Sequence, residues 1–218
     1  MKKQALVIGA VVLLVLGFGL ATGMYEGEQA EQVEAAAKEA GTSLAPKESM
    51  SVGPKDARVT VVEFFDPACE TCAAFHAPVK ELLAAHPDRV RLVVRYAPLH
   101  HGSADVVKML EAARRQDRYW EALDVMYATQ KLWASHHHPQ PELLWTLLPD
   151  SGLDLDMERL RTDAGGLAIA SLVQADIDAG AALGVRQTPT FLVNGRPLPS
   201  FGLQQLQALV AEEIAANY

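Results

Sequence analysis

The two cysteines of this chain lie in one motif, Cys69-x-x-Cys72, shortly after the apolar run Val59–Phe65. A short run rich in β-branched and aromatic residues predicts a buried strand, and the spacing of apolar residues predicts a helix over residues 69–85. A strand that leads through CxxC into a helix places the first sulfur at the helix N-terminus, where free N–H groups and the helix dipole favour a thiolate. The second sulfur lies one turn further on, close enough to form a disulfide. Because a structural zinc site needs about four ligands, a single cysteine pair predicts redox chemistry instead.

Size and charge limit the other possibilities. The chain has 218 residues, half of them hydrophobic, so it can bury a sizeable core without structural disulfides. Its formal net charge is −8 and no basic stripe is present, so nucleic acid is not an expected partner. With no cysteine outside the motif, nothing competes with the redox pair in an oxidising compartment.

The N-terminus carries a long uncharged segment, Gln4–Tyr25, behind Lys2 and Lys3. Two interpretations remain open: an uncleaved membrane-spanning helix, which needs about 17–25 residues, or a signal peptide cleaved after the small residues 21–23. We favour an anchor over residues 1–25. In both cases the lysines stay inside and the rest is exported. The expected location is an extracytoplasmic domain anchored in the cytoplasmic membrane, or a soluble periplasmic protein after cleavage.

The next segment, residues 26–56, is predicted to be a spacer. Residues 26–40 are rich in Ala, Glu and Gln without an apolar stripe, which indicates a solvated segment that can be helical. Residues 41–54 contain Gly, Ser, Thr and Pro and are typical of a flexible linker. The folded domain is therefore expected over residues 57–218.

The order of elements in this domain predicts an α/β fold. A second apolar run at residues 90–96 completes a strand–helix–strand unit with a right-handed parallel crossover. A helical block follows over about 103–183, with Ser103 as the expected cap of its first helix and a second helix expected over residues 119–130. The run Thr190–Val193 enters Asn194-Gly195, a strong hairpin signal, and an amphipathic helix ends the chain. The order is thus βαβ, helices, ββα.

This order, together with the segments Val62–Cys72 and Val185–Gly195, resembles the DsbA-like branch of the thioredoxin superfamily. The resemblance extends from about residue 52 to the C-terminus. It implies a thioredoxin-like α/β fold with an inserted helical subdomain, here preceded by an N-terminal transmembrane or signal helix.

The resemblance also implies a set of site residues. Cys69 matches the nucleophilic cysteine and Cys72 the buried resolving cysteine. Thr188 and Pro189 match the substrate-binding cis-proline loop that faces the sulfurs. Glu63 matches a carboxylate buried beneath the motif, so we expect its pKa to be raised and the group to shuttle the proton of Cys72.

The two residues between the cysteines depart from the well-known members of the superfamily. Glu70-Thr71 is neither the Pro-His of strong oxidases nor the Gly-Pro of thioredoxins, and Ala68 stands where thioredoxins have tryptophan. A negative Glu70 should raise the pKa of the Cys69 thiol by a small amount. We therefore interpret Glu70 and Thr71 as redox-tuning residues and expect a potential less extreme than that of the strongest oxidases.

The functional hypothesis is a thiol–disulfide oxidoreductase that exchanges disulfides with cysteine-containing exported proteins and is reset by a membrane redox partner. It needs no cofactor beyond the Cys69–Cys72 pair. A reductase or isomerase of the same fold, a metallochaperone using the cysteines and a histidine, and a non-catalytic adaptor remain as alternatives. The histidines at 100–101 and 136–138 are expected in solvated loops rather than at a metal.

Overall fold

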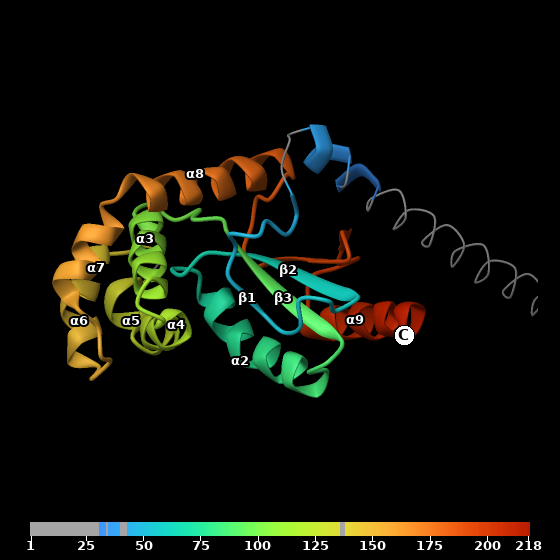
Figure 1. Ribbon diagram of the computed structural model, residues 1–218, viewed down its shortest axis with the longest axis horizontal. Helices are drawn as coiled ribbons and strands as arrows, with labels where there is room; N and C mark the ends of the chain where they lie inside the picture. The colour runs from blue at the N-terminus through green and yellow to red at the C-terminus, as the bar shows by residue number, and fades with distance from the viewer. Residues whose placement is uncertain (1–30, 34, 40–42, 136–137) are drawn as a thin grey trace, which may run out of the picture.

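The computed structural model describes residues 31–33, 35–39, 43–135 and 138–218 (Figure 1). The predicted anchor at residues 1–25 lies outside these ranges. None of the helices within the described ranges combines the length and the apolar character that crossing a membrane requires. Residues 31–33 and 35–39 are helical.

A mixed sheet forms the centre of the molecule, in the order β1-β3-β2-β4-β5. The strands β2 and β3 run parallel and are joined by α2, as the sequence predicted. The strand β4 pairs antiparallel with β2 and turns into β5. The bounds are β1 Ser51–Val52, β2 Val59–Phe65, α2 Glu70–Ala85, β3 Val90–Tyr96, β4 Thr190–Val193 and β5 Arg196–Pro197.

The predicted helical block lies to one side of the sheet, and α8 runs back towards it (Figure 1). The predicted helix of residues 119–130 ends earlier, at Ala128, and a separate short helix begins at Gln130. The elements after β3 are α3 Ser103–Arg114, α4 Tyr119–Ala128, α5 Gln130–Trp133, the 3₁₀ turn η2 Pro141–Leu143, α6 Leu144–Asp150, α7 Met157–Ala164, α8 Leu167–Ala182 and, after the hairpin, α9 Leu203–Asn217.

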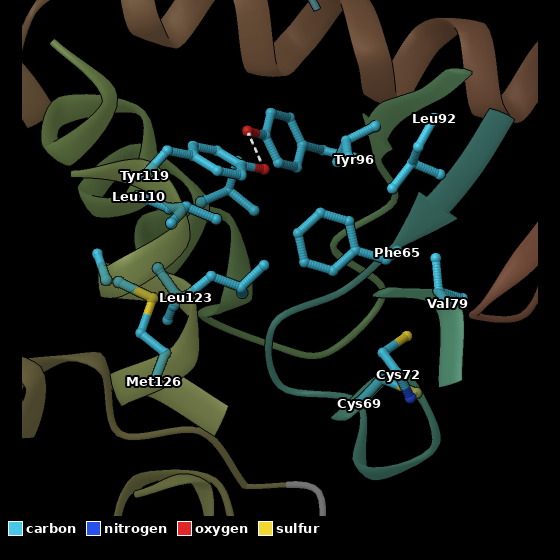
Figure 2. Close-up of a cluster of buried hydrophobic side chains, with 14 of the residues drawn as sticks. Phe65, Cys69, Cys72, Val79, Leu92, Tyr96, Leu110, Tyr119, Leu123 and Met126 are labelled. Carbon is cyan, nitrogen blue, oxygen red and sulfur yellow. Dashed lines mark hydrogen bonds between the residues drawn. The ribbon is translucent and has the colours of Figure 1, made fainter. Parts of the chain in front are cut away.

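Side chains of β2 alternate between two cores, as the period of a strand requires. Val62 and Phe64 pack in a small cluster on one face, which Leu44 and Leu183 complete. Phe65 points into the larger core on the other face, which extends from α2 and α9 into the helical block. Figure 2 shows this core continuing from the cysteines past Phe65 and Tyr96 to the α4 residues Tyr119, Leu123 and Met126.

Part of the predicted linker belongs to the sheet. Ser51 pairs with Val93 as the edge strand β1, and the Arg95 guanidinium donates to the Ser43 carbonyl at 2.6 Å. In this respect the structure differs from the expected flexible segment. A Gly- and Pro-rich composition favours flexibility only where the backbone finds no partner, and here the open edge of β3 provides one.

Buried polar contacts join the sheet to the helical block. Arg95 on β3 forms an ion pair with Asp176 on α8, with 2.6 Å between Nε and Oδ1. The Tyr96 hydroxyl donates to the Glu111 carboxylate at 2.5 Å and accepts from the Tyr119 hydroxyl at 2.9 Å. Since buried polar groups are costly without partners, these contacts favour one arrangement of the two parts.

Candidate active site

The turn before the cysteine motif is built on the buried carboxylate of Asp66. Its Oδ1 accepts the Ala68 N–H at 2.8 Å. Its Oδ2 accepts the backbone N–H of His100 at 3.0 Å, contacts His100 Nδ1 at 2.8 Å, and accepts the Ser103 hydroxyl at 3.0 Å. The loop that carries Cys69 is thus held to the start of the helical block.

Two sequence predictions are wrong at this point. Ser103 is the first residue of α3 rather than its cap; Gly102 stands at the cap position, and the Ser103 hydroxyl bonds Asp66 and the His100 carbonyl. His100 is half-buried against Asp66 rather than solvated. Both errors have one cause, because Asp66 lies more than thirty residues earlier in the chain and offers no local signal.

Cys69 occupies the N-cap of α2, as expected. Its sulfur accepts the Cys72 N–H at 3.4 Å, and in its protonated form it donates to the Thr188 carbonyl at 3.2 Å. The two cysteines are not bonded to each other in this structure. Cys69 is 7% exposed and Cys72 1%, so both residues are buried and Cys69 is the more accessible one.

The two thiols have opposite pKa shifts. A hydrogen bond from the Cys72 side chain lowers the pKa of Cys69 to about 5, helped by the Thr188 side chain and the backbone N–H groups of Thr71 and Cys72 and opposed by burial. Burial first, and then the hydrogen bond with Cys69 and its charge, raise the pKa of Cys72 far above its usual range. At neutral pH the outer sulfur is therefore a thiolate and the inner one a thiol, the division of roles that exchange requires.

The pKa of Cys69 is lowered, whereas the negative charge of Glu70 alone would raise it. Glu70 is exposed in the first turn of α2, beside a groove of about 410 Å³ that Lys131 also lines. A solvent-facing charge is screened. The hydrogen bonds at the helix terminus decide the sign instead. The roles of Glu70 and Thr71 in tuning the potential stay predictions.

Glu63 lies on β2, and its charge interacts with the charges of both sulfurs. It is 8% exposed and lines a largely apolar cavity of about 380 Å³ with Phe65 and Tyr127. Burial, with a smaller contribution from the Cys69 charge, raises the pKa of Glu63 to about 8. The raised pKa agrees with the sequence prediction. At neutral pH Glu63 is mostly a neutral acid close to the thiolate.

The loop before β4 faces the sulfurs, as the resemblance implied. The Thr188–Pro189 peptide bond is cis, and the Thr188 carbonyl accepts the Cys69 thiol. Pro189 is buried and Thr188 half-buried. Binding of substrate by this loop stays a prediction.

Sequence reasoning missed one residue of the site, Gln130 on α5. Its buried amide donates to the carbonyls of Pro67 and Cys69 at 2.9 and 3.1 Å. Gln130 closes the predicted helix of residues 119–130, where glutamine is an ordinary surface residue. No signal in the sequence distinguishes it from its neighbours.

The histidines expected in solvated loops have different surroundings. His101 and His138 are exposed, and His136 and His137 lie outside the described residues. In the described ranges, no three His, Cys, Asp or Glu side chains are grouped closely enough to hold a metal ion.

A thioredoxin family model matches residues 45–212. The chain belongs to the thioredoxin family. A solved structure, Pseudomonas aeruginosa DsbA2, superimposes with a TM-score of 0.61 at 27% identity, covering 79% of this chain and 97% of that one. This similarity confirms the resemblance to DsbA-like proteins that the two motifs predicted.

Two curated proteins are also similar in sequence to this chain. A Na(+)/H(+) antiporter NhaA of Herminiimonas arsenicoxydans is 34% identical over 146 residues, which are 67% of this chain but 22% of the antiporter. The chain thus spans less than a quarter of that relative's length. The "Probable disulfide bond formation protein D" of Bacillus anthracis is 28% identical over 151 residues, covering 66% of this chain and 69% of that protein.

Proposed function

We propose that this thioredoxin-family protein is a thiol–disulfide oxidoreductase that oxidises cysteine pairs in exported proteins. The observation that carries the proposal is the Cys69–Cys72 pair itself. One sulfur is a stabilised thiolate at a helix N-cap facing the Thr188 carbonyl, and the other is a buried thiol. The similarity to a disulfide bond formation protein supports the same chemistry.

The exchange proceeds in two displacements. A substrate thiolate attacks Cys69 of the oxidised pair; the Cys69–Cys72 bond breaks, and Cys72 leaves and takes up a proton. The second substrate thiolate then attacks the substrate sulfur of the mixed disulfide, and Cys69 leaves as a thiolate. The substrate gains a disulfide, and its two electrons remain on the cysteine pair until a membrane redox partner removes them.

The pKa of Cys69 supports the oxidising direction. A stabilised thiolate stabilises the reduced protein, so its disulfide is the stronger oxidant; thioredoxin has a pKa of about 7 and DsbA about 3.5 for this sulfur. A value of about 5 lies between them. A reductase or isomerase is the second candidate, because the shift is smaller than in the strongest oxidases.

We also propose that residues 1–25 hold the domain at the outer face of the cytoplasmic membrane. The uncharged run behind Lys2 and Lys3 supports this location. Cysteine-containing exported proteins are then the substrates within reach.

The test is a reduction potential combined with turnover. We expect a value between about −120 and −270 mV from equilibrium with glutathione, and net oxidation of a dithiol peptide by the oxidised protein. Mass spectrometry of the quenched reaction measures both. A potential at or below about −270 mV would instead support the reductase. A peptide that stays reduced would contradict the proposed function.

Replacing Glu63 with glutamine should slow the chemistry of Cys72 more than that of Cys69. When the reduced protein attacks a peptide disulfide, Cys72 must lose its proton, and ionised Glu63 is the base beside it. Since the pKa of Glu63 is about 8, the parent rate of this second step should rise as the pH passes through 8. Glu63→Gln should lack that rise and lose about 10²-fold, the lower end of general-base contributions.

Single-turnover rapid quench between pH 6 and 9 separates the two steps. Glu213→Gln is the matched control, because Glu213 is also 8% exposed but bonds Asn194 and Arg196 away from the pair. Equal rates of both steps in Glu63→Gln and the parent would show that Glu63 has only a packing role.

A further inference from the structure

The short helix α5 reaches from the helical block to the turn that carries Cys69. Both N–H groups of the Gln130 amide are used there, since Nε2 lies 2.9 Å from the Pro67 carbonyl oxygen and 3.1 Å from that of Cys69. Gln130 is 6% exposed. Its contacts are therefore made in a site from which water is largely excluded, where a hydrogen bond from an amide N–H to a carbonyl is stronger than at the surface.

The backbone of α5 is held firmly enough to position this amide. Trp133 is fully buried and its indole N–H donates to the Met126 carbonyl at 2.9 Å. The Thr129 hydroxyl donates to the Val125 carbonyl at 2.8 Å, and the Ala134 N–H donates to the Gln130 carbonyl at 2.7 Å. The side chain of Gln130 thus extends from a fixed base towards the turn.

The turn depends on Gln130 for one of its bonds. Pro67 has no backbone N–H, so its carbonyl is its one backbone polar group. Among the hydrogen bonds of the described residues, this buried carbonyl accepts the Gln130 amide and no other donor. The Cys69 carbonyl accepts Gln130 in addition to the Ala73 N–H at 3.1 Å, the first bond of α2. Gln130 holds both ends of the segment 67–69, and Asp66 holds its middle through Ala68.

We propose that Gln130 is a positioning residue through which the helical block sets the reactivity of the Cys69 sulfur. The inference rests on the thiol–disulfide exchange proposed above. The sulfur is stabilised by donors whose distances depend on the path of the turn, among them the Cys72 thiol and the Cys72 N–H at 3.4 Å. The amide also brings the positive ends of two N–H dipoles to the loop of the thiolate. Without them a buried carbonyl loses its partner, and the turn must shift to find another.

The variant Gln130→Met tests this, because methionine has a similar volume and no donor. The ultraviolet absorbance of the thiolate, followed against pH, gives the midpoint of the Cys69 titration. We expect the midpoint to rise by about one pH unit, a tenfold loss of thiolate below the parent's midpoint. The glutathione exchange equilibrium should shift about tenfold towards the oxidised protein, because the reduced form is less stabilised.

The other titratable groups around Cys69 are unchanged in this variant. They include Asp66 in the turn, Cys72 and Glu70 on α2, Glu63 on β2 and Tyr127 on α4. A shifted midpoint can therefore be attributed to the turn. Gln140→Met, at an exposed position of the same block, is the matched control and should keep the parent's midpoint.

A second variant covers the case in which Gln130→Met fails to fold. Gln130→Asn keeps the amide on a shorter side chain that cannot reach both carbonyls, and it should give a smaller shift in the same direction. If the folded Gln130 variants lose thermal stability but keep the parent's midpoint and exchange equilibrium, Gln130 is only structural and the inference is overturned. The titration does not need turnover, so a parent that titrates but fails to oxidise a peptide contradicts the proposed function alone.

Discussion

Replacing Cys72 with alanine should turn the protein into a trap for its substrates. Cys69 keeps its N-cap position and its bond from the backbone N–H of residue 72, so it can still attack a substrate disulfide. No thiol then follows to release the adduct. In cells that make oxidised exported proteins, most of the variant protein should be found in mixed disulfides. These should disappear when reductant is added.

The Cys72→Ala substitution also changes the reactivity of Cys69, so the pH of the experiment must be chosen to suit it. The Cys72 side chain is also the largest contributor to the lowered pKa of Cys69, so Cys72→Ala should raise that pKa above about 5. Adducts should therefore be collected at neutral or slightly alkaline pH. Non-reducing gels and mass spectrometry identify the trapped proteins, and fractionation of the adducts shows whether they are exported and membrane-associated.

Two further variants serve as controls. Cys69→Ala should trap nothing, because the remaining sulfur is buried and protonated. Thr188→Val in the Cys72→Ala background should change how long the adducts last, because Thr188 is placed to hold a bound peptide strand. The absence of adducts from Cys72→Ala would count against the oxidoreductase and in favour of the adaptor or the metallochaperone.

The regular elements near the site were predictable from local patterns. The strands Val59–Phe65 and Val90–Tyr96 have the bounds that their apolar runs predicted. Such runs are unambiguous because both strands are buried in the middle of a sheet, where polar residues are costly. Asn194-Gly195 predicted the hairpin for an equally local reason, since both residues adopt the positive φ angles that this turn requires.

The contacts between distant segments were not predictable in this way. Gln130 and Cys69 are 61 residues apart, and His100 and Asp66 are 34 apart. A glutamine in a helix and a histidine in a loop are ordinary in isolation, and only the packing of the helical block on the turn gives them partners. The same holds for the pKa of Cys69. It is lowered by hydrogen bonds from Cys72 and Thr188, which the charge of the neighbouring Glu70 does not predict.

Arg95→Met should be the most destabilising single change on the sheet. The guanidinium is 1% exposed and joins Asp176 on α8 at 2.6 Å to the carbonyl of Ser43. Removing one member of a buried pair costs about 3–5 kcal/mol, because the other charge stays buried without its partner. For a chain of this size the melting temperature should fall by about 10 °C. Calorimetry of the purified domain measures it.

Arg91→Met is the matched control on the same strand. Arg91 is half-buried, donates to the Ser51 hydroxyl at 3.1 Å and has no ion pair with α8; its loss should cost less than about 1 kcal/mol. Adding Asp176→Leu to Arg95→Met should recover part of the lost stability. The unpaired charge is then gone, although the Tyr96 N–H loses its acceptor.

Equal melting temperatures for Arg95→Met and Arg91→Met would show that the buried pair contributes nothing to the fold. The expected large difference has a consequence for the site. The helix α8 ends at Ala182 and the chain returns from it to Thr188 and Pro189. A pair that fixes α8 on β3 therefore also fixes the starting point of the loop that faces Cys69.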